Sequence, residues 1–289
     1  MATAIPLLRA PTLAGVTHAF TTRRGGVSDG PFATLNLGRG AGDDPACVAE
    51  NRRRVLSALG VDPAGHVEAT QVHGTAVVVV TRADAGRAVA GADGLLTADP
   101  AVTLAVHAAD CVPILLWDPR RGAVGAVHAG WRGTAAGIAG AAVAAMVRAF
   151  GTDPRDLRVA LGPAIGPDHY EVGPEVVAAF QARPRARAVV RPGQGDRGFL
   201  DLWEANRLEL IAAGVPPGQI WVSRRCTACH PELWFSYRRD GTTGRQAGLI
   251  SPRRSPRPAA PAGRRGGAAT GGDRPAPIGA HRSRRRAVE

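Results

Sequence analysis

Hydrophobic positions recur about every third or fourth residue in several stretches, the spacing that places them on one face of a helix. Glycine follows two of these stretches, at Gly60 and Gly151, and Thr134 precedes one of them as a candidate N-cap. The pattern predicts helices at residues 44–59, 135–150, 174–182 and 201–213.

Shorter apolar runs between glycines, prolines and polar residues predict strands. The continuous run at residues 77–80 is typical of a buried strand, and the other predicted strands lie at 20–22, 93–97, 103–106, 112–117, 123–127, 157–161, 220–222, 233–237 and 246–250. Helices alternate with strands, but hairpins join several of the strands. A mixed sheet, in an α/β fold of the α+β type, therefore fits better than a doubly wound parallel sheet.

The runs 112–117 and 123–127 flank the sequence Asp-Pro-Arg-Arg-Gly, which favours a tight turn and an antiparallel pair. If the turn centres between Pro119 and Arg120, Cys111 lies opposite His128. Directly opposite Cβ atoms are about 4.5–5.5 Å apart, so this thiol and imidazole would share one metal or one proton. A register change of two residues leaves them diagonal on the same face, whereas a change of one separates them.

The net charge of +12 over 289 residues is unevenly distributed. Residues 251–289 contribute +8 and consist largely of proline, glycine, alanine and arginine without apolar periodicity, which predicts a disordered tail after a folded domain at 1–250. We favour a solvated tail over one that binds nucleic acid. The domain carries only +4, which suits an anionic small substrate and gives no sign of a specific nucleic-acid partner.

No run approaches the roughly 20 apolar residues that cross a bilayer, and the N-terminus lacks the pattern of a secretory signal. Without export, the four cysteines are expected to be free thiols or metal ligands and not disulfides. These features predict a cytoplasmic protein with no membrane partner.

Two arginines lie beside glycines in predicted loops. Arg23 precedes Gly25 and Gly26, and Arg132 lies where a glycine loop enters a helix. Backbone amides and guanidinium groups at such places favour phosphate or carboxylate. Both arginines are candidate anion contacts, although the alternative, plain turns with solvated arginines, remains open.

The sequence Cys226-Thr-Ala-Cys229-His230 matches the c-type haem attachment pattern, but no export signal accompanies it. A zinc ribbon needs a second Cys-x-x-Cys pair, which is missing. A redox dithiol remains possible, and two unconnected thiols in a loop are favoured. The chain also lacks the signatures of a cytidine deaminase, a serine hydrolase elbow and a His-x-His copper protein.

His73, Cys111 and His128 remain, each at a predicted strand end next to small residues. Three nitrogen and sulfur ligands leave the fourth position of tetrahedral zinc open, as in catalytic sites. Without metal, the same residues would form a Cys–His pair for nucleophilic hydrolysis. Asp110, next to Cys111, would orient a ligand or act as a base.

Several motifs together resemble one family, long labelled "polyphenol oxidase, laccase domain" and reassigned as purine nucleoside phosphorylase. The match runs in order from about residue 17 to 250. Its motifs are Thr22-Arg23 with Gly25-Gly26-Val27-Ser28, Leu35-Asn36-Leu37, Gln71-Val72-His73-Gly74, Ala109-Asp110-Cys111-Val112-Pro113, His128-Ala129-Gly130-Trp131-Arg132-Gly133, Gly162-Pro163 with Tyr170-Glu171-Val172, and Ser236-Tyr237-Arg238-Arg239-Asp240.

The resemblance implies a single-domain layered sandwich with flanking helices and zinc held by His73, Cys111 and His128. It also implies phosphorolysis of adenosine, inosine and S-methyl-5'-thioadenosine to free base and (methylthio)ribose 1-phosphate, with adenosine deaminase side activity. We expect Cys111 and Asp110 to be catalytic, and Arg23 and Arg132 to bind phosphate. The alternative is a copper-dependent, laccase-like polyphenol oxidase that uses the same pocket.

Overall fold

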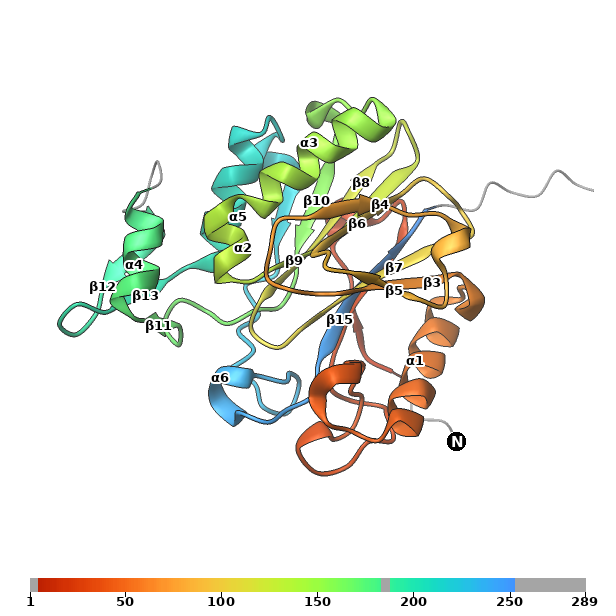
Figure 1. The fold of residues 1–289 in the computed structure, drawn as a ribbon, viewed down its shortest axis with the longest axis horizontal. Coiled ribbons are helices and arrows are strands. Elements are labelled where there is room, and N and C mark those ends of the chain that lie inside the picture. Colours follow the sequence, from red (N-terminus) through yellow and green to blue (C-terminus); the bar gives the residue numbers. More distant parts are fainter. Residues whose placement is uncertain (1–4, 183–187, 253–289) are drawn as a thin grey trace, which may run out of the picture. The chain divides into compact units, whose positions relative to one another are not determined.

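Two six-stranded sheets pack face to face in the computed structural model, which describes residues 5–182 and 188–252 (Figure 1). The first sheet has the strand order β1 (Leu7–Leu8), β2 (Thr17–Thr21), β15 (Gln246–Ser251), β7 (Thr103–Ala108), β3 (His66–Thr70), β5 (Ala88–Ala90). The second has the order β14 (Ile220–Val222), β10 (Arg158–Leu161), β8 (Val112–Asp118), β9 (Ala123–Ala129), β6 (Gly94–Thr97), β4 (Val77–Val79). Parallel and antiparallel pairs occur in both sheets, so the predicted mixed-sheet α/β sandwich is confirmed.

Helices cover the outer faces of both sheets. Helix α1 (Pro45–Leu59) packs on the first sheet, and α3 (Ile138–Phe150) with α5 (Leu202–Ala212) packs on the second (Figure 1). Strand alternation supplies both interfaces: on β8, Leu115 faces the other sheet, whereas Ile114 and Leu116 face the helices. All described residues fall in one compact unit, as a single domain requires.

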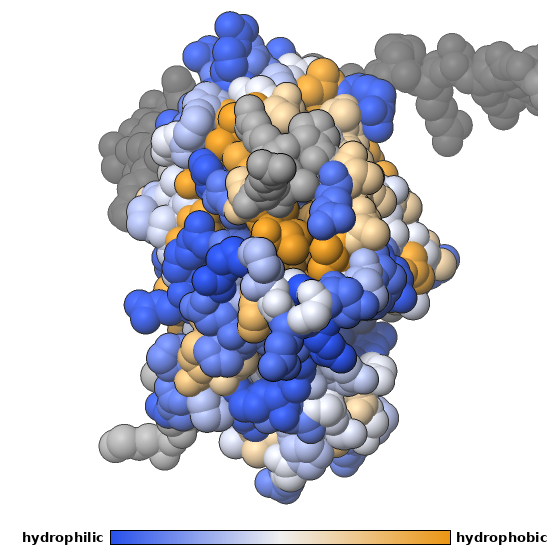
Figure 2. Space-filling view, turned by 90° about the vertical axis from the view of Figure 1, so that its left-hand side faces the viewer, coloured by the Kyte–Doolittle hydropathy of each residue, from blue (hydrophilic) through white to orange (hydrophobic). Residues whose placement is uncertain are grey.

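A smaller antiparallel sheet and three short α-helices lie beside the two large sheets. The small sheet has the order β11 (Glu171–Val172), β13 (Gly198–Leu200), β12 (Val190–Pro192), and the helices are α2 (Trp131–Ala136), α4 (Pro174–Gln181) and α6 (Tyr237–Asp240). The side of the molecule that carries α4 and α6 is largely hydrophilic, and hydrophobic side chains gather in its upper half (Figure 2).

The predicted helix at 135–150 is wrong in its start and its continuity. Helix α2 begins at Trp131 with Gly130 as its N-cap, so Thr134 lies buried within it and is not a cap. Gly137 then adopts a left-handed conformation, with φ 92°, and separates α2 from α3. The other three helices form, with Asp44 and Asp201 capping two of them through side-chain hydrogen bonds.

Two strand predictions also need correction. Residues 233–237 form no strand, because the side chain of Gln246 takes the place of a neighbouring strand by bonding both backbone groups of Phe235. The run at 77–80 forms β4, but as an edge strand in which Val79 is 47% exposed. The remaining predicted strands are confirmed within a few residues.

The central hairpin forms with a register shifted by two residues from the one assumed above. Val112 pairs with Ala129, and Pro113 pairs with His128. Cys111 is therefore diagonal to His128 and not opposite it, but both side chains stay on the same face.

The predicted boundary between domain and tail falls slightly early. Ser251 is the last residue of β15, and its hydroxyl donates to the carbonyl of Val102 at 2.8 Å. Residues 253–289, which contain nearly all of the predicted tail, lie outside the described residues. Among those that are described, no helix is long and apolar enough to cross a membrane.

Candidate functional site

His73, Cys111 and His128 converge at strand ends, where β7 of the first sheet leads into β8 and β9 of the second. Their ligand atoms lie within 4.8 Å of one another, and the Cys111 Sγ is 3.9 Å from the His73 Nε2. His128 is buried on β9, and Cys111 directly precedes β8. The structure thus brings together all three predicted ligands, including His73, which comes from a segment 38 residues before Cys111.

Gln71 explains how His73 reaches the site. After β3 ends, the Gln71 side chain accepts from the backbone N–H of His107 and donates to its carbonyl, both at 2.8 Å. The amide replaces the backbone pair that the parallel ladder between β3 and β7 would otherwise form. The chain is held against β7 as it leaves the sheet, and His73 follows two residues later.

Asp93 organises both histidines. One carboxylate oxygen accepts from the His128 Nδ1 at 2.8 Å and from the backbone N–H of His73 at 3.0 Å, and the other accepts from the amides of Val72 and Gly74. These bonds hold His73 in a left-handed conformation, with φ 61°. Because the His128 Nδ1 is engaged, its Nε2 is directed to the cluster, as in metal sites that hold histidine through a carboxylate.

The backbone packs closely behind the cluster. A Cβ on Gly130 would lie 2.7 Å from the His73 Cδ2 and 3.0 Å from the Cys111 Sγ. Glycine is therefore required by space at this position, since its φ of −76° is open to any residue. Gly130 thus makes room for the cluster, whereas a Cβ on Gly133 would meet the carbonyl oxygen of Gly74 at 2.8 Å.

Electrostatics favour an ionised Cys–His pair. Burial opposes ionisation of Cys111, but the neighbouring His128 and His73 lower the pKa of its thiol to about 6. Burial likewise disfavours the charged form of His128, yet Cys111 and Asp93 raise its pKa to about 9. At neutral pH these shifts favour a thiolate and an imidazolium, so the sulfur is in the form that binds metal, whereas His128 would lose its Nε2 proton on metal binding.

The donor set fits a metal ion. A tetrahedral zinc ion with bonds of about 2.0–2.3 Å places sulfur and nitrogen ligands roughly 3.5 Å apart, close to the separation observed here. Three ligands leave one position for substrate or water. His73 is the exposed member of the three, and His128 is buried.

The cluster lies in the wall of a cavity of about 670 Å³, a size typical of small-molecule sites. Arginine dominates its charged lining, and the carboxylates there are Glu68 and Asp110; the arginines are Arg39, Arg52, Arg132, Arg238 and Arg245. Glu68 is already paired with Arg52 at 2.7 Å. The cavity therefore attracts anions.

Asp110 lines the cavity beside Cys111 and is 7% exposed. One of its carboxylate oxygens accepts from the Thr227 hydroxyl at 2.6 Å, and the other accepts from the backbone N–H of Arg238, also at 2.6 Å. The carboxylate thereby anchors the segments at 227 and 238 to the start of β8.

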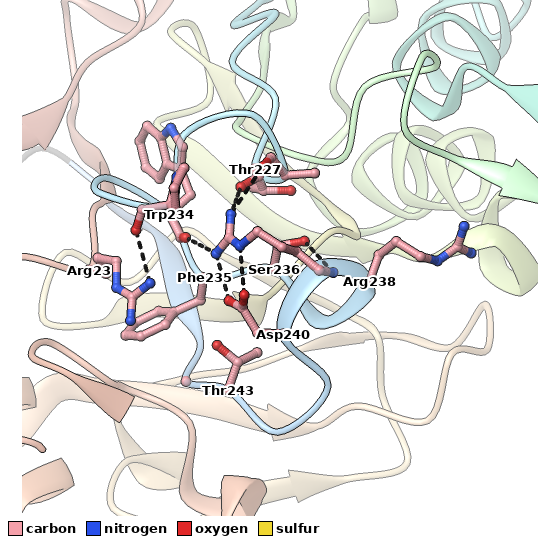
Figure 3. A network of polar contacts seen from close by, with 12 residues as sticks. Arg23, Thr227, Trp234, Phe235, Ser236, Arg238, Asp240 and Thr243 are labelled. Atoms are coloured by element: carbon pink, nitrogen blue, oxygen red, sulfur yellow. Dashed lines mark hydrogen bonds and ion pairs between the residues drawn. The ribbon is translucent and has the colours of Figure 1, made fainter. Parts of the chain in front are cut away.

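The two predicted anion contacts separate in the structure. Arg132 lines the cavity, with its guanidinium 4.5 Å from the Trp131 ring centre and no carboxylate partner among the described residues. Arg23 is not part of the cavity lining: it donates to the carbonyls of Ala33 and Pro231 and stacks 4.6 Å from the Phe235 ring centre (Figure 3).

Sequence reasoning missed several residues of the site. Asp93 was assigned only to a strand, and its position before a buried Gly-Leu-Leu strand was the available signal. The family motifs contained Tyr170, Tyr237 and Arg238, which line the cavity, but gave them no role. Arg245 gave no signal, because only folding brings it to the cavity.

Comparisons with known proteins identify a family and agree with the fold. The model of the family described as multi-copper polyphenol oxidoreductase laccase matches residues 17–253. The purine nucleoside phosphorylase of Deinococcus radiodurans is 48% identical over 252 residues, covering 86% of this chain and 94% of that relative. The purine nucleoside phosphorylase YlmD of Geobacillus stearothermophilus is 46% identical over 254 residues, covering 84% and 93%. The crystal structure of YlmD from the same organism superposes with a TM-score of 0.84 at 45% identity, over 88% of this chain and 98% of that chain.

Proposed function

Because the chain belongs to the family described as multi-copper polyphenol oxidoreductase laccase, and relatives almost half identical to it are named purine nucleoside phosphorylases, we propose that it cleaves purine nucleosides with phosphate. The proposed substrates are adenosine, inosine and S-methyl-5'-thioadenosine, and the products are the free base and the (methylthio)ribose 1-phosphate. The observation that carries the proposal is the convergence of His73, Cys111 and His128 on a cavity lined by arginines.

Phosphorolysis requires a site that binds two reactants and stabilises charge. Phosphate is an anion, and the arginine lining favours it over water. Arg132 is our candidate for direct contact, because its guanidinium has no carboxylate partner among the described residues. Tyr170 and Tyr237 line the same cavity and offer apolar faces to a purine ring. Holding both reactants in one orientation supplies a large part of the rate acceleration.

We propose zinc as the metal, held by His73, Cys111 and His128. When bound, it supplies a Lewis acid beside the substrate. Asp93 keeps the imidazole of His128 oriented, and Cys111 takes part as a ligand that is already ionised. Asp110 accepts two hydrogen bonds, so we propose that it orients the wall of the pocket and the adjacent Cys111.

The purified chain should form ribose 1-phosphate from adenosine or inosine only when phosphate is added, as followed by mass spectrometry. Inosine formed from adenosine without phosphate would reveal the proposed deaminase side activity. The absence of any sugar phosphate from all three nucleosides would refute phosphorolysis.

A paired substitution separates the two predicted phosphate contacts. Arg132→Ala should raise the KM for phosphate by about 10- to 100-fold, the equivalent of losing a charge-assisted hydrogen bond, without loss of stability. Arg23→Ala should leave that KM unchanged and lower the free energy of unfolding by about 1–2 kcal/mol, because it removes hydrogen bonds to Ala33 and Pro231. A raised phosphate KM in the Arg23 variant would instead support the phosphate role that the sequence suggested.

Copper-dependent oxidation of phenols is the second candidate. Two histidines and one cysteine are also the ligands of blue copper sites, and the family description names copper. This candidate predicts oxygen uptake that rises with bound copper and does not need phosphate. Metal analysis of protein purified without added metal, paired with the nucleoside assay, distinguishes the two functions.

We also propose a cytoplasmic location. All four cysteines are free, and the site needs Cys111 as a reduced thiolate, a state that the reducing cytosol preserves. Cell fractionation that recovers the protein from an oxidising compartment would contradict this location.

A further inference from the structure

A second group of metal-binding side chains lies outside the cluster described above. The ligand atoms of His169, Cys226 and Cys229 all fall within 4.8 Å of one another. The His169 Nδ1 is 3.5 Å from the Cys229 Sγ and 3.9 Å from the Cys226 Sγ. These separations bracket the roughly 3.5–3.8 Å expected between ligands on one tetrahedral zinc ion.

The backbone prepares this cluster. Ala164 and Cys226 form a parallel bridge, which sets the segment before His169 beside the segment that holds both cysteines. The N–H of Gly166 donates to the Cys226 Sγ at 3.2 Å, which holds this sulfur beside the segment of His169. The carbonyl of Gly166 accepts from the N–H of His169 at 3.0 Å, which turns the chain so that the imidazole faces the sulfurs.

The sequence spacing agrees with the geometry. Cys226 and Cys229 are separated by two residues, as in Cys-x-x-Cys zinc sites. The Cys-x-x-Cys pair lacked a partner in the sequence because the third donor, His169, lies 57 residues earlier and arrives through the fold. An imidazole within reach of both sulfurs distinguishes the cluster from a bare dithiol.

We propose that His169, Cys226 and Cys229 form a second metal site, which binds one zinc ion through two thiolates and one imidazole. Sulfur and imidazole ligands favour zinc over magnesium or calcium, whose preferred ligands are oxygens. His169 and Cys229 are exposed and Cys226 is half-buried, so an ion reaches the site directly from solvent.

The site joins two segments that shape the main cavity. Tyr170, next to His169, lines that cavity, and Thr227, next to Cys226, donates to the carboxylate of Asp110. Arg239 also bonds to the carbonyls of Thr227 and Ala228, within the network that contains Ser236 and Asp240 (Figure 3). A zinc ion there would fasten the segment at 166–170 to the segment at 226–229 and so stiffen one wall of the cavity.

Metal stoichiometry of the full chain tests the proposal. Reduced protein freed of metal is titrated with zinc alone, and the bound ions are counted by native mass spectrometry. We expect two zinc ions in the wild type, one in Cys229→Ser, one in His169→Ala and one in His73→Ala. In the His73→Ala background, adding Cys229→Ser should remove the remaining zinc. Both residues of the second cluster chosen for substitution are exposed, which limits the effect on folding.

Cys47→Ser is the matched control. Cys47 is a half-buried free cysteine on α1 that belongs to neither cluster, and this variant should still bind two ions. Cobalt binding to the His73→Ala protein gives an independent measure. Its thiolate-to-cobalt charge-transfer absorption should fall when Cys229→Ser is added.

Three results would overturn the proposal. The first is a Cys229→Ser protein that keeps two zinc ions, and the second is a wild type that binds only one ion and keeps it in Cys229→Ser. The third is a reduced wild type that forms a Cys226–Cys229 disulfide in air equally fast with and without zinc. The count in the His73→Ala background does not depend on catalysis. Failure of the phosphorylase proposal therefore leaves this test intact.

Discussion

The two His and Cys clusters differ most in how their ligands are held. In the first, Asp93 accepts four hydrogen bonds that fix His128 and the backbone of His73, and Gly130 leaves room for the cluster. In the second, one backbone N–H supports one sulfur, and two of the three side chains are exposed. The first cluster is preorganised and faces the cavity, as catalysis requires. The second resembles a structural metal site that links two surface segments.

Replacing a cysteine in each cluster should give the largest contrast. Cys111→Ala should lower turnover of nucleoside by at least about 10³-fold, the scale reached when a preorganised charge-stabilising group is lost, and should remove one zinc ion. Cys229→Ala should remove the other ion and keep most of the activity. Steady-state kinetics with metal analysis measure both. A Cys111→Ala protein that retains stoichiometric zinc at the first cluster would show that the assigned ligands are wrong.

The support given by Asp93 is tested by Asp93→Asn. In asparagine only the amide oxygen accepts hydrogen bonds, because the amide nitrogen is a donor, so the four bonds of Asp93 cannot all be kept. Zinc affinity or activity should therefore fall by about 10- to 100-fold, as is typical for residues that orient metal ligands. Asp84→Asn is the control, because Asp84 also accepts from backbone but in an exposed capping box away from the site. Equal zinc affinity in the Asp93 variant and the wild type would remove the distinction between the clusters.

Replacing a glycine beside each cluster by alanine tests how much space the backbone leaves there. Gly130→Ala should weaken zinc binding at the first cluster by about 1–3 kcal/mol, because the new Cβ would lie 2.7 Å from His73. Gly166→Ala should cost less at the second cluster, since its Cβ would lie 3.3 Å from Cys226. Gly218→Ala, whose Cβ would meet no atom within 4 Å, is the control. Calorimetric zinc titrations of the three variants check this order, and a reversed order would contradict the geometry.

Thiol reactivity of the metal-free protein should show the smallest difference. The pKa of Cys111 is lowered to about 6, whereas burial and the adjacent Cys226 raise the pKa of Cys229 to about 11. A lowered pKa keeps Cys111 as a thiolate as pH falls towards 6, so its reaction with a small disulfide reagent should lose rate only below about pH 6.

The reaction of Cys229 should still be accelerating at pH 10, because its thiolate fraction keeps growing. At pH 8 the thiolate fractions differ by about 10³, but the lower basicity of Cys111 offsets most of this, which leaves about a tenfold advantage at most. Mass spectrometry of each cysteine peptide measures the two rates. A shared pH midpoint would mean that the clusters do not differ electrostatically.

The sequence determined the elements that local chemistry controls. Apolar spacing located α1, α4 and α5 because one buried face suffices to fix a helix. Asp44 and Asp201 cap the starts of α1 and α5 through their side chains. Alternating and continuous apolar runs located every strand of the second large sheet, but in the first sheet they located β2, β7 and β15 and missed β1, β3 and β5. Residue type and position also gave the candidate ligands His73, Cys111 and His128, since few other side chains bind metal through nitrogen or sulfur.

Only the tertiary structure decided which distant partners meet. Hairpin register depended on the whole sheet, so pairing moved by two residues from the turn-based prediction while keeping its face. The fold alone assigned Asp93 to both histidines, His169 to the two later cysteines, and Arg23 and Arg132 to different surroundings. A carboxylate, an imidazole or a guanidinium has the same local sequence preferences whichever partner it finds, and that partner is chosen by the packing of segments that lie far apart in the chain.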